Sequence, residues 1–210
     1  MSEITNKLLN ILDKISDEII KNEDILTDLD RKIGDGDHGL NMKRGFQAIK
    51  NEIQLLEEMN ASDIFNKCAM TLITNVGGAS GPLYGTAFMK IGMSLKNKTD
   101  EEIIKKENMF IAMTEAIKGI KDRGKADISE KTMLDVLIPA VEEFGKYKDT
   151  LSIKEIFQKM EIVAKEGLEY TKIIKATKGR ASYLGERSIG VEDPGSYSSY
   201  IIIKTISENL

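Results

Sequence analysis

The sequence is short of the features that mark secreted, membrane-spanning and zinc-binding proteins. Its 210 residues contain one cysteine, which cannot build an internal disulfide framework or a cysteine-rich zinc cluster and favours a reducing cytoplasm. No run of about 18 apolar residues is present, and the charged N-terminus is unlike a signal peptide. With 30 basic against 34 acidic residues, the net charge of −4 gives no general attraction to nucleic acid. We therefore expect a cytoplasmic protein without nucleic-acid or membrane partners.

Proline is also scarce, with three residues, and helical periodicity dominates the rest of the chain. Apolar side chains recur every three or four positions in eight segments, and no pair of strands is predicted. Thr99 and Glu102 predict a capping box that opens one long helix through Ile120. Asp193 followed by Pro194 predicts the N-cap and first residue of a final helix. The pattern predicts an all-α fold of about eight amphipathic helices in one domain.

Four of the predicted connections are rich in glycine, namely residues 34–42, 77–85, 122–133 and 178–196. Most of the seventeen glycines fall in these stretches. Because glycine costs chain entropy on folding, such a concentration indicates tight backbone paths or the close approach of a ligand.

The first of these connections predicts a magnesium site. Asp30, Asp35 and Asp37 place three carboxylates within eight residues, and such like charges are unfavourable together unless a cation joins them. Oxygen ligands with free coordination positions suit Mg²⁺, whereas an EF-hand for Ca²⁺ would need glutamate where Phe46 stands. The glycines also match the dinucleotide fingerprint, but no strand precedes them, so that interpretation is rejected. A solvated acidic turn is the alternative.

The second and fourth connections predict phosphate contacts. Ala79 and Ser80 lie in a glycine turn before a helix, where backbone amides and the helix end attract anions, although a simple packing turn is an equal alternative. Lys178, Arg180 and Arg187 offer cations in the last connection. Arg180 could instead form a surface ion pair with a nearby glutamate, Glu186 or Glu192.

Two further residues are candidates for chemistry. His38 is the only histidine, and its aspartate neighbours make it a possible acid, base or nucleotide contact. Cys68 shares an apolar stripe with Phe65 and Leu72, so we expect it in the core. Carboxylates for Mg²⁺, glycine-rich helix starts for phosphates and an arginine-bearing connection together predict a nucleotide–metal site for phosphoryl transfer.

The segments GDGDHGLNMKRGF, GGASGPLYGTAF, DRGKA with KTMLD, and GRASYLGERSIGVEDPGSYS closely resemble the nucleotide-binding L subunits of dihydroxyacetone kinases. They occur in the same order over nearly the whole chain. The resemblance implies that residues 1–210 form one domain, a barrel or bundle of about eight antiparallel helices with the nucleotide site at one end. It also implies two Mg²⁺ ions held by Asp30, Asp35 and Asp37.

The same resemblance implies a set of contacts to ADP or ATP. No residue is implied as a certain catalytic group, and Arg180 is a possible phosphate stabiliser. The implied nucleotide contacts are His38, Gly39, Leu40, Asn41, Ala79, Ser80, Gly124, Met133, Arg180, Asp193, Pro194 and Gly195.

The resemblance further implies a phosphotransferase-system-dependent kinase subunit that is inactive without its partners. A phosphohistidine-carrying M subunit would rephosphorylate the bound ADP, and the γ-phosphoryl group would then pass to dihydroxyacetone on a K subunit. The alternatives are the nucleotide subunit of another small-substrate kinase, a stand-alone Mg²⁺-dependent phosphohydrolase, and a non-catalytic helical adaptor.

Overall fold

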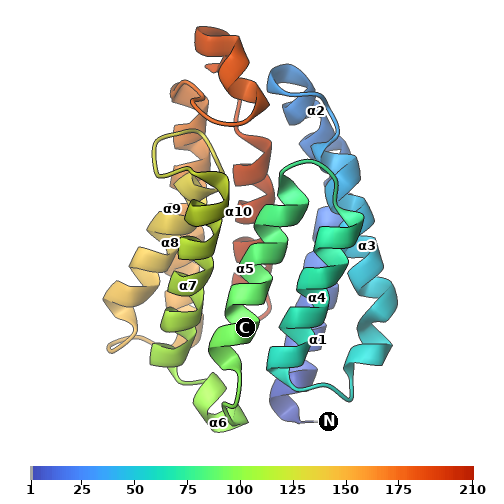
Figure 1. Ribbon diagram of the computed structural model, residues 1–210. Helices are drawn as coiled ribbons and strands as arrows, with labels where there is room; N and C mark the ends of the chain where they lie inside the picture. Colours follow the sequence, from blue (N-terminus) through green and yellow to red (C-terminus); the bar gives the residue numbers. More distant parts are fainter. Residues whose placement is uncertain (1) are drawn as a thin grey trace.

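A computed structural model describes residues 2–210 of the chain. This part contains helices and no strand, which confirms the predicted all-α class. The long helices run up and down beside one another along a common direction (Figure 1). In chain order the elements are α1 (Glu3–Lys21), α2 (Glu23–Ile33), α3 (His38–Leu56), α4 (Ala61–Asn75), α5 (Ser80–Leu95), α6 (Asp100–Ile103), α7 (Lys106–Gly124), α8 (Leu134–Tyr147), α9 (Ile153–Ile173), the 3₁₀ helix η1 (Arg180–Ser188) and α10 (Pro194–Glu208).

The long helices pack in a closed circuit. Helices α1, α3, α4, α5, α7, α8, α9 and α10 each contact the next, and α10 returns to α1. Buried apolar side chains fill the interior, among them Phe46 of α3, Leu72 of α4 and Leu134 of α8. The arrangement is therefore a packed helical bundle and not an open barrel. Close packing of this kind makes the relative positions of the helix ends well defined.

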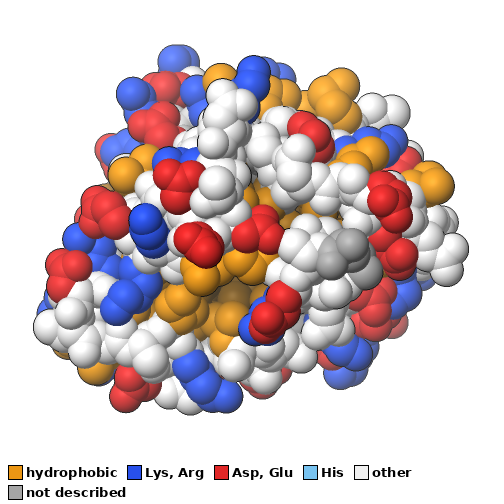
Figure 2. Space-filling view, turned by 90° about the horizontal axis from the view of Figure 1, so that it is seen from below, with side chains coloured by type: hydrophobic (Ala, Val, Ile, Leu, Met, Phe, Trp, Pro, Cys, Tyr) orange, Lys and Arg blue, Asp and Glu red, His pale blue; other side chains and the backbone are white. Residues whose placement is uncertain are grey.

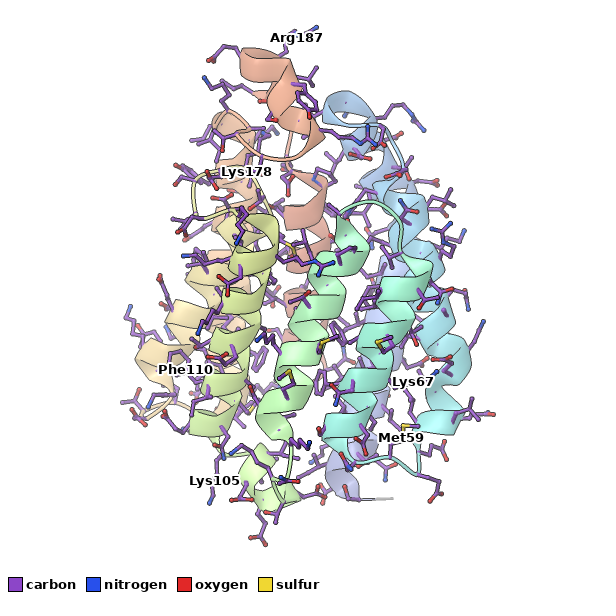
Figure 3. All side chains as sticks on the ribbon, in the orientation of Figure 1. Met59, Lys67, Lys105, Phe110, Lys178 and Arg187 are labelled. Atoms are coloured by element: carbon purple, nitrogen blue, oxygen red, sulfur yellow. The ribbon has the colours of Figure 1, made fainter. Side chains whose placement is uncertain are left out.

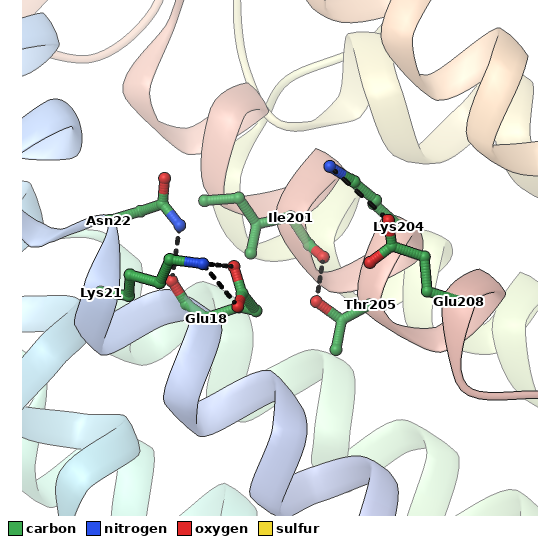
Figure 4. A network of polar contacts seen from close by, with 7 residues as sticks. All are labelled: Glu18, Lys21, Asn22, Ile201, Lys204, Thr205 and Glu208. Atoms are coloured by element: carbon green, nitrogen blue, oxygen red, sulfur yellow. Dashed lines mark hydrogen bonds and ion pairs between the residues drawn. The ribbon is translucent and has the colours of Figure 1, made fainter.

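The chain has a break in its first helical segment that the periodicity did not indicate. At Asn22 the backbone leaves the helical region, which separates α1 from α2. The Asn22 side chain donates a hydrogen bond of 2.8 Å to the carbonyl oxygen of Glu18, and Lys21 forms an ion pair with the Glu18 carboxylate (Figure 4). These contacts satisfy groups at the end of α1, and α2 continues to Asp30 at the predicted acidic cluster.

The prediction of one long helix after Thr99 was wrong. The capping box of Thr99 and Glu102 is present, but it opens the four-residue helix α6. The backbone of Lys105 is extended and α7 begins at Lys106. Asn108 explains the interruption in part, because its side-chain amide donates to the carbonyl oxygen of Glu102 at 2.7 Å and so satisfies a group that a continuous helix would have paired.

The two ends of the bundle differ. Lys178 and Arg187 lie at the end formed by the glycine-rich connections and η1, whereas Met59 and Lys105 lie toward the other end (Figure 3). Viewed from that second end, hydrophobic side chains are visible in a central hollow with charged groups around it (Figure 2). Among the described residues, no helix combines the length and the apolar character needed to cross a membrane.

Candidate nucleotide and metal site

A pocket opens at the end of the bundle where η1 lies. Four helices begin at it, since Asp37, Ala79, Met133 and Asp193 are the N-caps of α3, α5, α8 and α10 and all line the pocket. The pocket encloses a cavity of about 190 Å³ and is open to the exterior. Helix N-termini carry partial positive charge, so their convergence favours an anionic ligand.

The three predicted metal ligands meet at the rim of this pocket. One carboxylate oxygen from each of Asp30, Asp35 and Asp37 lies within 4.8 Å of the others. Gly36 between the last two has a φ of +75°, a conformation that side-chain-bearing residues rarely adopt. The tight turn that this glycine permits brings the two loop carboxylates back to Asp30 at the end of α2. The donor set is the one that Mg²⁺ prefers.

The Asp30 side chain also has a structural role at the start of α3. Its Oδ2 atom accepts hydrogen bonds from the backbone N–H groups of Asp37 at 2.8 Å and His38 at 3.1 Å. Asp30 is buried, whereas Asp35 is exposed at the rim. Asp30 therefore fixes the start of α3, and its carboxylate joins the end of α2 to the following helix.

The last glycine-rich connection forms a flap, residues 175–190, beside the pocket. Its 3₁₀ helix η1 is kinked at Gly185, where φ is +56°. Arg180 lies at the start of η1 and its Nε atom is 3.0 Å from Oδ2 of Asp35. The alternative pairing of Arg180 with Glu186 or Glu192 is not found; Glu186 pairs with Lys175 instead. Lys178 and Arg180 line the pocket, and Arg187 does not.

His38 belongs to a buried polar network below the acidic cluster. Its Nε2 atom is 3.0 Å from the Ser198 hydroxyl, and its Nδ1 atom is 2.9 Å from the Ser80 hydroxyl. The Tyr84 hydroxyl is 2.8 Å from the hydroxyls of both Ser198 and Ser199. Burial lowers the pKa of His38 to about 4, against the opposing charge of Asp37, so the imidazole is neutral at pH 7. The network joins α3, α5 and α10 and fixes the tilt of the ring.

Asp193 starts α10 as the sequence predicted. Its side chain accepts from the N–H of Ser196 at 2.6 Å, and Pro194 follows as the first helical residue. Burial raises the pKa of Asp193 to about 6, while hydrogen bonds from Ser196 and the charge of Lys131 act in the other direction. Because its side chain accepts the Ser196 N–H, we interpret Asp193 as the cap of α10. The neighbouring residues Pro194 and Gly195 also line the pocket.

Most of the implied nucleotide contacts line the pocket, and four do not. Gly39 packs against α2, where a Cβ atom would lie 2.2 Å from the carbonyl oxygen of Glu23. Asn41 is buried and accepts a hydrogen bond from Arg44. Leu40 is exposed, and Gly124 faces Leu83 at the end of α7. Those that line the pocket are His38, Ala79, Ser80, Met133, Arg180, Asp193, Pro194 and Gly195.

The pocket also contains residues outside the implied set of nucleotide contacts. Tyr84, Lys131 and Thr132 all line the pocket. The segment containing Lys131 and Thr132 had been singled out as glycine-rich, but no spacing distinguishes a buried lysine from a surface one. Cys68, by contrast, is buried in the core as predicted, and burial raises the pKa of its thiol to about 12.

Comparison with known proteins identifies the family of this chain. Residues 32–208 match the family model of the DAK2 domain. The ADP-binding subunit DhaL of PEP-dependent dihydroxyacetone kinase 1 from Listeria innocua is 42% identical over 92% of this chain and 91% of that protein. The corresponding DhaL subunit from Escherichia coli K12 is 35% identical over 99% of this chain and 98% of its own length.

The fold is also found in a solved structure. The dihydroxyacetone kinase of C. freundii, in complex with AMP-PNP and Mg²⁺, superposes with a TM-score of 0.75 at 22% identity. The match covers 96% of this chain and 33% of that longer protein. With a family model that spans most of the chain and relatives matched over nearly their full length, the chain belongs to the DAK2-domain family, together with the ADP-binding DhaL subunits of PEP-dependent dihydroxyacetone kinases.

Proposed function

We propose that this chain is the nucleotide-holding subunit of a dihydroxyacetone kinase. It binds ADP or ATP with Mg²⁺ in the pocket, where phosphoryl groups pass between a phosphohistidine-carrying M subunit and dihydroxyacetone held on a K subunit. The DhaL names of the relatives support the assignment. We also propose that the described bundle acts as one nucleotide-binding domain, since residues from both ends of the chain line one pocket.

The observation that carries this proposal is the meeting of opposite charges at one mouth. Three carboxylates converge within 4.8 Å beside a pocket lined by four helix N-termini and by the cations of Lys178 and Arg180. A ligand made only of anions would be repelled by the carboxylates, and a cation alone would leave the helix ends unused. A magnesium–nucleotide complex satisfies both halves.

Asp30, Asp35 and Asp37 would hold the metal, and we propose two Mg²⁺ ions as the resemblance implies. Bound there, Mg²⁺ would supply positive charge to the phosphate oxygens during phosphoryl transfer. The remaining task of the protein is to position the nucleotide. The N–H groups of Ser80 and Gly81 at the start of α5, the N–H of Gly195 at the start of α10 and the Ser80 hydroxyl can bind phosphate oxygens. Met133 offers an apolar surface.

Arg180 is the residue that we propose to stabilise charge on the transferred group. It lies on the flap at the open side of the pocket, and its side chain is 70% exposed. His38 is neutral, and its two ring nitrogens contact the hydroxyls of Ser198 and Ser80. We propose that it orients these hydroxyls at the site and contributes no charge to it. We assign no nucleophile to this chain, and therefore expect it to be inactive without its partner subunits.

The decisive experiment is calorimetric titration of the metal-stripped protein with ADP, with and without Mg²⁺. The proposal predicts binding that depends on Mg²⁺, and no phosphorylation of dihydroxyacetone until K and M subunits are added. A matched titration of the Asp37→Ala variant should show no Mg²⁺-dependent binding. Absence of binding by the wild-type protein in both conditions would favour a non-catalytic helical adaptor.

Two other outcomes separate the remaining functions. Steady release of inorganic phosphate from ATP by this chain alone would indicate a phosphohydrolase, because a subunit that retains its nucleotide should protect it from water. Mg²⁺-dependent nucleotide binding without transfer to dihydroxyacetone in the complete assay would indicate the nucleotide subunit of another small-substrate kinase.

A further inference from the structure

Lys131 is a buried lysine whose ammonium group is surrounded by backbone carbonyls. Only 1% of the residue is exposed, and its φ is +61°, in the left-handed region. The Nζ atom donates to the carbonyl oxygens of Thr171, of Val191 at 2.5 Å and of Ile174 at 3.4 Å. An ammonium has three donors, and here all three point at main-chain oxygens.

These three carbonyls mark the two ends of the flap. Thr171 is in the last turn of α9 and Ile174 is the residue that ends this helix. Val191 comes just after the flap and two residues before Asp193, the N-cap of α10. The flap between these carbonyls carries Lys178 and Arg180, which line the pocket. The Lys131 side chain therefore bonds to both ends of the flap, residues 171–174 and 191–193, which we call its hinges.

Other hydrogen bonds close the same junction. The N–H of Gly190 donates to the carbonyl of Lys172 at 2.7 Å, and the N–H of Asp193 donates to the Thr171 hydroxyl at 3.0 Å. Within the flap, the Ala176 N–H donates to the Ser188 hydroxyl at 2.9 Å. The two hinges are therefore side by side, and Lys131 is the charged group between them.

If residue 131 only filled space in the interior, an apolar side chain would serve better than a lysine. Burial lowers the pKa of Lys131, and the carboxylates of Asp193 and Asp135 counteract this effect. Burying an ammonium is unfavourable unless its hydrogen bonds are well formed, and replacing it with a hydrocarbon would leave buried carbonyls without a partner. The ammonium group of Lys131 therefore lies where it can order the flap, a connection that has few apolar contacts of its own.

We propose that Lys131 is a positioning residue of the nucleotide site: by fastening both ends of the flap, it holds Arg180 in place over the acidic cluster. The inference rests on the proposed function for its effect on nucleotide binding, and on the hinge contacts alone for its effect on the flap. Lys131 itself acts through Arg180 and not through direct chemistry.

The test combines a flap probe with a double-mutant cycle. Tyr183 in the flap is 87% exposed, so limited chymotrypsin digestion there is governed by local unfolding of the flap backbone and does not depend on lysine. Lys131→Met should speed this cleavage and weaken Mg²⁺-dependent ADP binding by about tenfold. In an Arg180→Ala background, Lys131→Met should weaken ADP binding little further, because the residue that it positions is already gone.

The control is Lys172→Met, a change of an exposed lysine in the same hinge. It should leave cleavage and affinity at wild-type values. Should Lys131→Met fail to fold, Lys131→Gln, which keeps two donors, should give cleavage between wild type and fully open. Wild-type cleavage in the folded variant, or a full additional affinity loss in the Arg180→Ala background, would overturn the proposal. If the wild-type protein binds no ADP, the proposed function fails, and the cleavage comparison still decides the role of Lys131.

Discussion

The guanidinium Nε of Arg180 lies 3.0 Å from a carboxylate oxygen of Asp35, which links the flap to the acidic cluster at the mouth of the pocket. The pair joins a residue of the last connection to one of the first. On the proposed function, a cation bound by Asp35 would weaken this pairing, because the carboxylate charge would be shared. Arg180 would then be available to phosphate oxygens, so metal binding and arginine placement are coupled.

Replacement of Arg180 should separate binding from folding. The side chain is 70% exposed, and exposed ion pairs contribute little stability. Arg180→Ala should therefore leave the free energy of unfolding of the metal-free protein nearly unchanged and weaken Mg²⁺-dependent ADP binding. Urea unfolding and calorimetry measure the two quantities. Arg187→Ala, at the other end of η1 and outside the pocket lining, is the control and should bind ADP as the wild type does.

The three aspartates should not behave alike in the metal-free protein. Asp30→Ala removes the acceptor of two backbone hydrogen bonds and should cost about 2 kcal/mol of unfolding free energy. Asp37→Ala removes one of three clustered charges and no side-chain hydrogen bond at its helix, so stability should be unchanged or higher. Both should lose Mg²⁺-dependent ADP binding. Loss of folding in metal-free Asp37→Ala would show that the cluster is structural.

The buried imidazole should make stability depend on pH. His38 titrates at about 4 in the folded protein, below its ordinary value of 6.5. The unfolded chain therefore takes up the proton first as the pH falls, and stability present above pH 6.5 is lost between pH 6.5 and 4. Relative to His38→Gln, the wild type should lose about 2 kcal/mol between pH 7 and 4.5. Urea titrations at both values test this, and equal losses in the two proteins would contradict it.

Gly167 should tolerate no side chain. It faces α8 from α9, and a Cβ atom there would lie 2.2 Å from the backbone carbonyl oxygen of Asp135. Gly167→Ala must push the two helices apart and should cost about 2–3 kcal/mol of stability, measured by thermal or urea unfolding. The neighbouring exposed change Glu166→Ala should cost little. Because Asp135 lies in the first turn of α8, the same shift should also weaken ADP binding.

Much of the fold follows from the sequence because amphipathic helices have a strong local signal. The spacing of apolar residues and the Asp193–Pro194 cap were sufficient to predict the class and the start of α10. The breaks at Asn22 and Lys105 were not predicted, since each depends on side-chain contacts with one particular carbonyl. Such single hydrogen bonds leave no periodic pattern for the sequence to display.

The acidic residues of the candidate site could be singled out from the sequence, whereas contacts between distant parts of the chain could not. Asp30, Asp35 and Asp37 were singled out because three carboxylates so close in the sequence favour a cation site over a solvated acidic turn. Their assigned role as metal ligands stays a prediction. Lys131 was missed because its partners lie far away along the chain, for example at Val191. Long-range contacts of this sort become visible only after the circuit of helices has closed.

The four helix starts at the pocket come from widely separated parts of the chain, beginning at residues 38, 80, 134 and 194. A fragment must extend from Asp30 to Gly195 to contain the whole pocket lining, so ligand affinity should arise only when nearly the entire bundle has assembled. A ligand that binds only this assembled state shifts the folding equilibrium toward it in proportion to its occupancy. Supply of nucleotide during synthesis would therefore protect the whole polypeptide from degradation, and not just the loops that touch it.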